Sequence, residues 1–274
     1  MLKEGVNMHK TYYCFPEGKH KVLTMSYDDG KLEDKRLVEI FNKHGIKGTF
    51  HINGGLFENP ERLDKEVVSS LYMGHEIACH TLTHPTIERC PREFIVKQIL
   101  EDREILEDIV GFPVRGLSYP NGSYNEEIKK VLPMLGISYS RTVNSTHGYG
   151  LPSDLMEWNP TCHHNDSKLM ELGRDFAENK KKQYLYLMYV WGHSYEFERD
   201  YNWNVIEEFC EYMGRREDIW YATNIEIVDY LQAVQRLIYT ASGNGVYNPS
   251  ALDVWISVDD EPVKVAGGNF VKLY

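Results

Sequence analysis

The chain has 274 residues, of which 42 % are hydrophobic, and this content excludes a wholly disordered protein. Lys and Arg total 30 against 41 Asp and Glu, and the net charge of −11 argues against binding to the phosphate backbone of nucleic acids. No segment approaches the roughly 18 consecutive apolar residues of a membrane span, so we expect no membrane insertion. The length suits one α/β domain, or one domain with a short appendage.

The N-terminus and the cysteines indicate the compartment. The first 21 residues carry charges, Gly5 and His9 where a signal peptide would have an apolar run, so we expect the chain as written to stay in the cytoplasm. The five cysteines are scattered and never form a Cys-x-x-Cys pair, which argues against a disulfide framework or a thiolate zinc site.

β-rich runs alternate with helical patterns seven times along the chain, which predicts a parallel sheet. The runs are residues 22–27, 48–53, 76–79, 114–119, 137–141, 184–191 and 219–222. The helices are expected near residues 32–44, 61–73, 91–110, 125–135, 168–179, 204–213 and 223–239. Gly45 is a natural end for the first helix, and Thr223 with Glu226 predicts a capping box for the last. Seven such units favour a (β/α) barrel that does not close fully.

Two segments stand outside this alternation. The connection over residues 142–167 is about 25 residues long, and loops of that length in compact domains are usually functional or disordered. After the seventh helix, residues 252–258, 262–265 and 270–273 have the pattern of short strands. We therefore divide the chain into a barrel over residues 1–240 and a small C-terminal β appendage over residues 245–274, which would cover a barrel edge or mediate self-association.

Polar residues follow several of the predicted strands. In parallel (β/α) barrels these strand ends line one mouth, where active sites are built. Asp28 and Asp29 end the first strand, and adjacent carboxylates repel each other unless a cation lies between them. His80 and His84 follow the third strand at a spacing that reaches one metal ion. Alone, Asp-Asp-Gly is a common turn and the histidine pair is more often on the surface; together they predict a catalytic metal with open positions.

These residues resemble a known family. Ser-Tyr-Asp-Asp-Gly at residues 26–30 is similar to the Thr-Phe-Asp-Asp-Gly motif of polysaccharide deacetylases, the NodB-homology group of carbohydrate esterase family 4. His-Thr-Leu-Thr-His at residues 80–84 matches the family's His-Ser/Thr-x-x-His motif. The resemblance implies an α/β fold of the distorted (β/α)7 barrel type. It also implies a hydrolase that removes acetyl groups from carbohydrates with a divalent metal, most often Zn²⁺, with Co²⁺ or Ni²⁺ as alternatives.

The family's roles carry over to matching positions. The resemblance implies that Asp29, His80 and His84 hold the metal ion. It makes Asp28 the general base that takes a proton from the water at the metal. His193, after the sixth strand, aligns with the histidine that protonates the leaving group.

The resemblance also implies substrate contacts. The backbone N–H of Asn121 would stabilise the oxyanion, with Tyr119 in the same segment among the substrate-binding residues. Trp191 would line the pocket for the acetyl methyl group, with a buried core Trp as the alternative. Trp158 is the candidate wall of the substrate groove. His163, beside His164, would touch the substrate or the open side of the metal, unless the pair simply faces solvent.

Two parts of the family pattern are missing. Ser118 occupies the position where the family has an Arg that orients the base. Arg115 lies three residues upstream and is either a replacement or an ordinary ion-paired residue. We interpret His51, inside the second strand, as a core or rim histidine. The carboxylate that keeps His193 protonated has three candidates, namely Glu157, Asp166 and Glu196.

Three functions stay open at this point. The first is deacetylation of a soluble acetylated oligosaccharide or polysaccharide fragment, by a monomer or an oligomer. The second is hydrolysis of a non-sugar C–N bond, such as a cyclic imide or ureide, on the same fold. The third is carbohydrate binding without catalysis at a vestigial metal site. A panel of acetylated sugars and imides separates the two enzymes, and ligand binding without hydrolysis would indicate the third.

Overall fold

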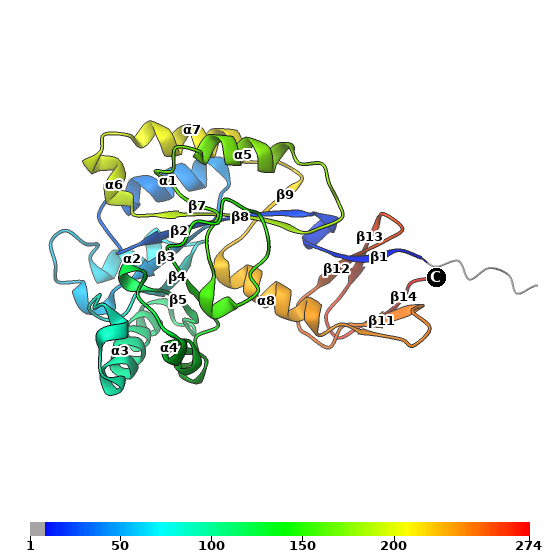
Figure 1. Ribbon diagram of the computed structural model, residues 1–274, viewed down its shortest axis with the longest axis horizontal. Helices are drawn as coiled ribbons and strands as arrows, with labels where there is room; N and C mark the ends of the chain where they lie inside the picture. Colours follow the sequence, from blue (N-terminus) through cyan, green and yellow to red (C-terminus); the bar gives the residue numbers. More distant parts are fainter. Residues whose placement is uncertain (1–8) are drawn as a thin grey trace, which may run out of the picture.

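A computed structural model describes residues 9–274 of the chain. Its centre is a parallel sheet with the strand order β6-β5-β4-β3-β2-β8-β7, in which β9 also pairs with β2 (Figure 1). The strands are β2 (Lys21–Asp28), β3 (Gly48–Ile52), β4 (Glu76–Cys79), β5 (Gly116–Ser118), β6 (Tyr139–Arg141), β7 (Cys162–His163), β8 (Tyr186–Gly192) and β9 (Ile219–Tyr221). The sheet is curled, which confirms the predicted distorted barrel. Every residue of β2 is buried, as expected of a strand covered on both faces.

The long connection over residues 142–167 contains the segment that closes the barrel between β6 and β8, which we call the seam. At one end the Trp158 N–H donates a hydrogen bond to the Ser140 carbonyl in β6 (2.9 Å). At the other end the Thr161 N–H donates to the Tyr189 carbonyl in β8 (2.8 Å). Residues 158–163 therefore bridge β6 and β8. The sequence did not reveal β7, because two strand residues are too short for a periodic pattern.

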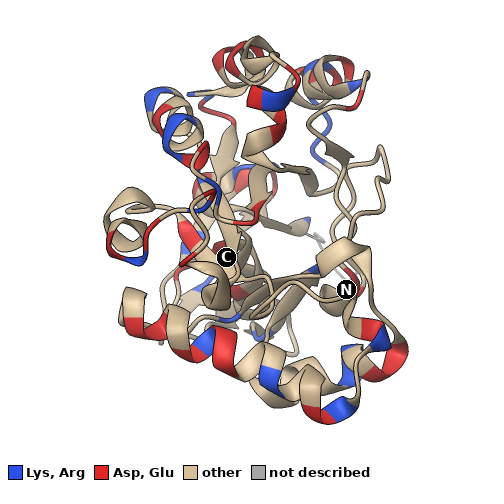
Figure 2. Ribbon diagram, turned by 90° about the vertical axis from the view of Figure 1, so that its left-hand side faces the viewer, with Lys and Arg blue, Asp and Glu red and all other residues tan. Residues whose placement is uncertain are grey.

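Helices surround the sheet and carry many of the charged residues (Figure 2). They are α1 (Asp34–His44), α2 (Lys65–Leu71), α3 (Arg92–Val110), α4 (Glu126–Val131), α5 (Leu169–Glu178), α6 (Ser194–Arg199), α7 (Trp203–Met213) and α8 (Asn224–Gln235). Short 3-10 turns lie at Pro16–Gly18, Gly54–Leu56, Ile87–Arg89, Pro120–Gly122, Leu132–Leu135 and Leu155–Glu157. Gly45 ends α1 at φ 68°, and Thr223 with Glu226 forms the predicted capping box of α8. The sequence analysis did not predict α6, a single short helix directly after β8.

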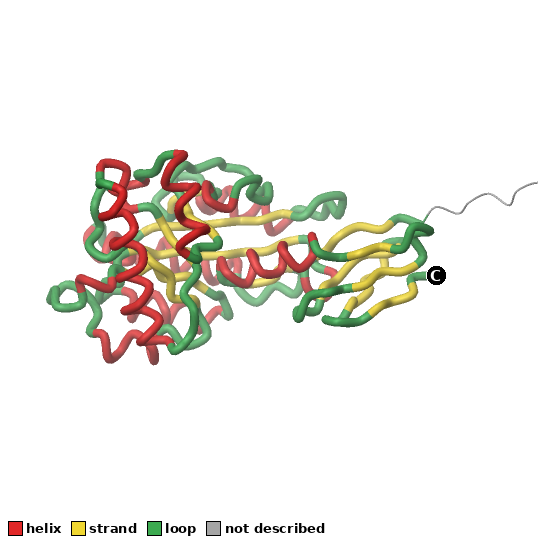
Figure 3. The backbone as a smooth tube through the Cα atoms, turned by 90° about the horizontal axis from the view of Figure 1, so that it is seen from below, coloured by secondary structure: helices red, strands yellow, loops and turns green. Residues whose placement is uncertain are grey.

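The C-terminal strands form a β unit at the end of the barrel opposite the mouth (Figures 1 and 3). Its strands are β1 (Thr11–Cys14), β10 (Ile238–Tyr239), β11 (Gly245–Tyr247), β12 (Val254–Val258), β13 (Glu261–Val265) and β14 (Phe270–Lys272). They make two antiparallel sheets, β1-β12-β13 and β10-β11-β14. Strands from residues 245–274 thus pair with two strands outside that range, and the proposed domain division stays a prediction.

Three expectations concern the cellular compartment: the signal peptide, the cysteines and membrane insertion. The predicted lack of a signal peptide rests partly on residues 1–8, which lie outside the described residues. All five cysteines are free. Within residues 9–274, no helix combines the length and the apolar character needed to cross a membrane.

A buried carboxyl group lies at the start of β4, at the end of the barrel away from the mouth. Glu76 accepts hydrogen bonds from the Thr49 hydroxyl (3.0 Å) and the Tyr139 hydroxyl (2.8 Å). It also accepts one from the Ile225 N–H (2.8 Å). Burial raises the pKa of Glu76 to about 7, because these neutral donors only partly replace water around the charge.

This pKa makes Glu76 a source of pH-dependent instability. Because its folded pKa lies above its unfolded value, stability falls as the pH rises from about 4.5 to about 7. Glu76→Gln removes the ionisation, and its amide oxygen can still accept from Thr49 and Ile225 while its N–H donates to the Tyr139 hydroxyl oxygen. Between about pH 5 and about pH 8, the wild type should lose about 2 kcal/mol more unfolding free energy than the variant. Urea unfolding at both pH values measures this, and equal losses would contradict the prediction.

Candidate active site

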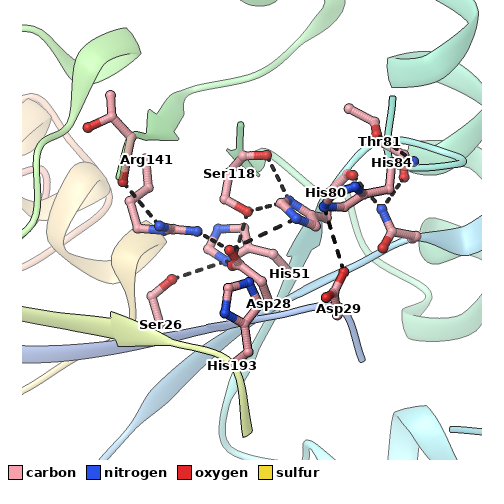
Figure 4. Close-up of polar contacts among 12 residues, drawn as sticks. Ser26, Asp28, Asp29, His51, His80, Thr81, His84, Ser118, Arg141 and His193 are labelled. Carbon is pink, nitrogen blue, oxygen red and sulfur yellow. Dashed lines mark hydrogen bonds and ion pairs between the residues drawn. The ribbon is translucent and has the colours of Figure 1, made fainter. Parts of the chain in front are cut away.

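Three side chains converge at the mouth of the barrel in an arrangement that suits a metal ion. Asp29 follows β2, His80 follows β4, and His84 lies four residues further on. Their ligand atoms all lie within 4.8 Å of one another, and His84 Nε2 is 3.9 Å from Asp29 Oδ1 (Figure 4). One carboxylate and two imidazoles are the donors of catalytic zinc sites that keep a position open for water.

Hydrogen bonds orient His80 for metal binding. Its Nδ1–H donates to the Ser118 carbonyl oxygen (2.9 Å), which leaves the Nε2 lone pair for an ion. Its backbone N–H donates to Asp102 Oδ2 (3.1 Å), and the other oxygen of Asp102 accepts from the Gly54 N–H (2.6 Å). The residues present therefore fit a divalent ion both in donor type and in the protonation of the imidazole.

The backbone around these ligands is held in unusual conformations. Asp29, Thr81 and His84 have φ values of 84°, 63° and 59°, in the left-handed region. Such conformations cost of order 1–3 kcal/mol each and persist only when the surroundings hold them. Here the Asn53 side chain donates to the Thr81 carbonyl (2.8 Å), and the His84 N–H donates to the Thr81 hydroxyl (3.2 Å). The strain is concentrated at the residues that would bind the metal.

Asp28 lies beside the ligand group and is almost completely buried. Ser118 Oγ donates to its Oδ1 (3.1 Å), His51 Nδ1 lies 3.3 Å from the same oxygen, and Arg141 pairs with its Oδ2. Burial alone would raise the pKa of Asp28, but the Arg141 guanidinium and the neighbouring imidazoles hold it well below its ordinary value. Asp28 is therefore ionised at neutral pH and can accept a proton. His51, interpreted above as a core histidine, is buried but contacts Asp28.

The two arginines have different surroundings. Arg115 makes two hydrogen bonds to Asp229, at 2.8 and 2.7 Å, so it is an ordinary ion-paired residue rather than a partner of Asp28. The guanidinium next to Asp28 comes instead from Arg141, on β6. The sequence around Ser118 does not indicate this residue, because Arg141 lies on the neighbouring strand and is its partner only in the register of β5 and β6.

A second polar cluster faces the mouth from β7, β8 and α6. Glu196 Oε2 lies 3.1 Å from His163 Nε2, 3.1 Å from His164 Nε2 and 3.5 Å from His193 Nδ1. Burial raises the pKa of this carboxyl, but the three imidazoles reverse the effect and hold it far below its ordinary value. Burial lowers the pKa of His193, but Glu196 together with Asp28 and Asp29 outweighs this effect, and the net shift is upward. The cluster thus favours a protonated His193.

The structure decides among the three candidate carboxylates. Glu157 lies 2.6 Å from Lys129, and Asp166 lies 2.6 Å from His147. Glu157 thus pairs with α4 and Asp166 pairs within the long connection, so Glu196 alone of the three contacts His193.

The second cluster resembles a metal site by composition, but its hydrogen bonds argue otherwise. His163, His193 and Glu196 place their ligand atoms within 4.8 Å of one another. However, His163 Nδ1 accepts a hydrogen bond from the Asn165 N–H (3.1 Å). A neutral imidazole that accepts at Nδ1 carries its proton on Nε2, so this nitrogen donates to Glu196 and has no lone pair for an ion.

The predicted substrate contacts divide into two groups. Trp191, 8 % exposed, lies at the edge of the site, with the Arg141 guanidinium 4.3 Å from its ring. Asn121 is exposed beyond Pro120 and has a φ of 57°. Trp158 and Tyr119 are each 1 % exposed, so they line no groove.

The burial of these two aromatic residues has a structural cause. Trp158 packs edge-on against Tyr139 and Tyr189 inside the barrel, because the bridging segment turns it inward. Tyr119 stacks on Tyr124 and donates its hydroxyl proton to the Met156 carbonyl (2.7 Å). Both predictions of substrate contact are therefore corrected.

Comparisons with known proteins show which proteins this chain is similar to. The family model for polysaccharide deacetylase matches residues 15–140, which include both sequence motifs. A chitooligosaccharide deacetylase of Sinorhizobium fredii is 25 % identical over 127 residues, 46 % of this chain and 53 % of that protein. A peptidoglycan-N-acetylglucosamine deacetylase of Bacillus cereus is 29 % identical over 123 residues, 43 % of each chain. The matches thus span about half of these relatives' length.

Solved structures show the same fold over more of the chain. A candidate polysaccharide deacetylase from Mycobacterium smegmatis aligns with 83 % of this chain and 96 % of its own, with a TM-score of 0.63 and 20 % identity. A CE4 family pseudoenzyme from Bacillus anthracis aligns with 80 % of this chain and 68 % of its own, with a TM-score of 0.50 and 17 % identity. The fold alone therefore does not establish catalysis. Residues 15–140, with both motifs, are thus similar to the polysaccharide deacetylase family, and the barrel has the fold of the solved structures.

Proposed function

We propose that the chain is a metal-dependent hydrolase that removes acetyl groups from a carbohydrate. The observation that carries the proposal is the position of ionised Asp28 beside the group formed by Asp29, His80 and His84. A carboxylate that does not bind the ion but lies next to it can act as a base on water there. The ion we propose is Zn²⁺, with Co²⁺ or Ni²⁺ as alternatives.

The residues of the site would divide the reaction between them. A divalent ion bound there supplies water of lowered pKa and polarises the acetyl carbonyl. Asp28 accepts the proton of the attacking water. His193, kept protonated by Glu196, donates a proton to the departing nitrogen or oxygen. Asn121 offers a backbone N–H near the developing oxyanion, and Trp191 borders the space for the methyl group.

The relatives support a substrate class. The Sinorhizobium protein is named for chitooligosaccharides and the Bacillus cereus protein for peptidoglycan N-acetylglucosamine. Both names describe N-acetylated sugars, so we propose that this chain cleaves the amide of an N-acetylated oligosaccharide. Imides and ureides are the substrates to examine if no acetate is released.

The first prediction separates the base from the metal ligands. Asp28→Asn should retain zinc and lower turnover by about 10²–10⁴-fold, because it removes the base but no ligand. His84→Ala should lose both zinc and turnover. Acetate release from N-acetylglucosamine oligosaccharides, measured after chelation and reloading with zinc, tests both variants.

Asp166→Asn is the matched control, since Asp166 pairs with His147 away from the ligands. Full activity of the chelated wild-type protein would contradict the proposal. So would unchanged turnover of Asp28→Asn.

The second prediction concerns the proton donor. Because Glu196 raises the pKa of His193, Glu196→Gln should lower that pKa. Activity that needs protonated His193 disappears as the pH rises through this pKa. The basic limb of the profile of kcat against pH should therefore move to lower pH in the variant.

Glu157→Gln, which removes a carboxylate paired with Lys129, should leave the basic limb in place. An unchanged basic limb in zinc-loaded Glu196→Gln would show that Glu196 does not control the donor.

A further inference from the structure

A buried guanidinium from β6 pairs with Asp28. Arg141 is completely buried, and its Nη2 donates to Asp28 Oδ2. Its Nη1 donates to the Thr142 carbonyl (3.0 Å), and its guanidinium carbon lies 4.3 Å from the centre of the Trp191 ring. The guanidinium is thus held by the backbone on one side and by an aromatic face on another, with Asp28 as its charged partner (Figure 4).

The strand register explains how this side chain reaches Asp28. In the parallel pair of β5 and β6, Ser118 and Arg141 are direct partners. Partner residues of adjacent strands direct their side chains to the same face of a sheet. Positions 118 and 141 therefore present side chains to the same region, and both contact Asp28. A guanidinium from either strand could approach the same carboxylate.

Ser118 makes contacts that an arginine at this position would not make. Its Oγ donates to Asp28 Oδ1 (3.1 Å) and lies 2.6 Å from His80 Nδ1. Since Oγ uses its only proton toward Asp28, it shares the Nδ1–H of the imidazole with the Ser118 carbonyl oxygen. The small side chain at 118 therefore links the carboxylate to a metal-ligating histidine and leaves room for the guanidinium from β6.

We propose that Arg141 is the positioning residue for the base, and that it supplies from β6 the guanidinium that the family resemblance places at position 118. The proposal rests on the proposed function, in which Asp28 is the base. Arg141 acts through Asp28 and touches no metal ligand in the described structure. Its loss should therefore reduce kcat while zinc binding stays intact and KM changes little.

Three variants at position 141 test the proposal. Arg141→Ser should lower kcat by about 10²-fold or more, within the range for loss of a well-placed general base. Arg141→Lys should recover part of this loss, because lysine retains the charge but lacks the planar fork. Free guanidinium ion, added as its chloride, should raise kcat of Arg141→Ser but not of Asp28→Asn. Arg115→Ser, which removes the arginine paired with Asp229, is the matched control and should keep wild-type kcat.

The most specific test exchanges the two positions. The double variant Ser118→Arg/Arg141→Ser returns a guanidinium to Asp28 from β5, so its kcat should exceed that of Arg141→Ser by about tenfold or more. Zinc content and thermal unfolding establish that each variant is folded and loaded.

Wild-type kcat in zinc-loaded Arg141→Ser would overturn the proposal. If that variant does not fold, wild-type kcat in Arg141→Lys together with no gain in the double variant would overturn it. Absence of rescue both by guanidinium and by the double variant would do the same. Wild-type activity of Asp28→Asn is a different outcome, because it would reject the proposed base itself.

Discussion

The site depends on keeping one buried carboxylate ionised. Asp28 has almost no contact with water, and an unpaired charge in such a place would be neutralised or would destabilise the fold. The guanidinium of Arg141, the hydroxyl of Ser118 and the imidazole of His51 compensate it together. These partners come from three strands that flank or face the end of β2. The curl of the sheet therefore places the ionised Asp28 next to the proposed metal ligands.

The seam of the barrel positions the second polar cluster, which surrounds His193. Residues 158–163 bridge β6 and β8, and the chain that leaves this bridge carries His163 and His164 to Glu196. The backbone at Gly192 allows this approach, because a Cβ there would lie 2.0 Å from the His164 ring. A segment that closes the barrel thus also builds the environment of His193. One connection therefore both closes the barrel and surrounds the proposed proton donor, His193.

The sequence predicted what consecutive residues determine. The strand ends at Asp28 and His80, the helix caps and the barrel follow from local patterns and from chain order. It did not predict the partner of Asp28, because the pairing of Ser118 with Arg141 depends on strand register. It also could not choose among three carboxylates for His193, since only the position of α6 brings Glu196 close. The prediction that Trp158 lines the substrate groove was wrong for a similar reason. A Trp in a long connection suggests an exposed contact residue, whereas the bridge over residues 158–163 buries it.

The central claim is that Asp29, His80 and His84 bind a divalent ion beside Asp28. Anomalous diffraction at the zinc edge, from crystals grown with zinc, tests it most directly. The account predicts a peak with these three residues as ligands at about 2.0–2.2 Å, and with Asp28 outside the coordination sphere. A peak at His163, His193 and Glu196 instead, or no ordered zinc at the mouth of the barrel, would contradict it.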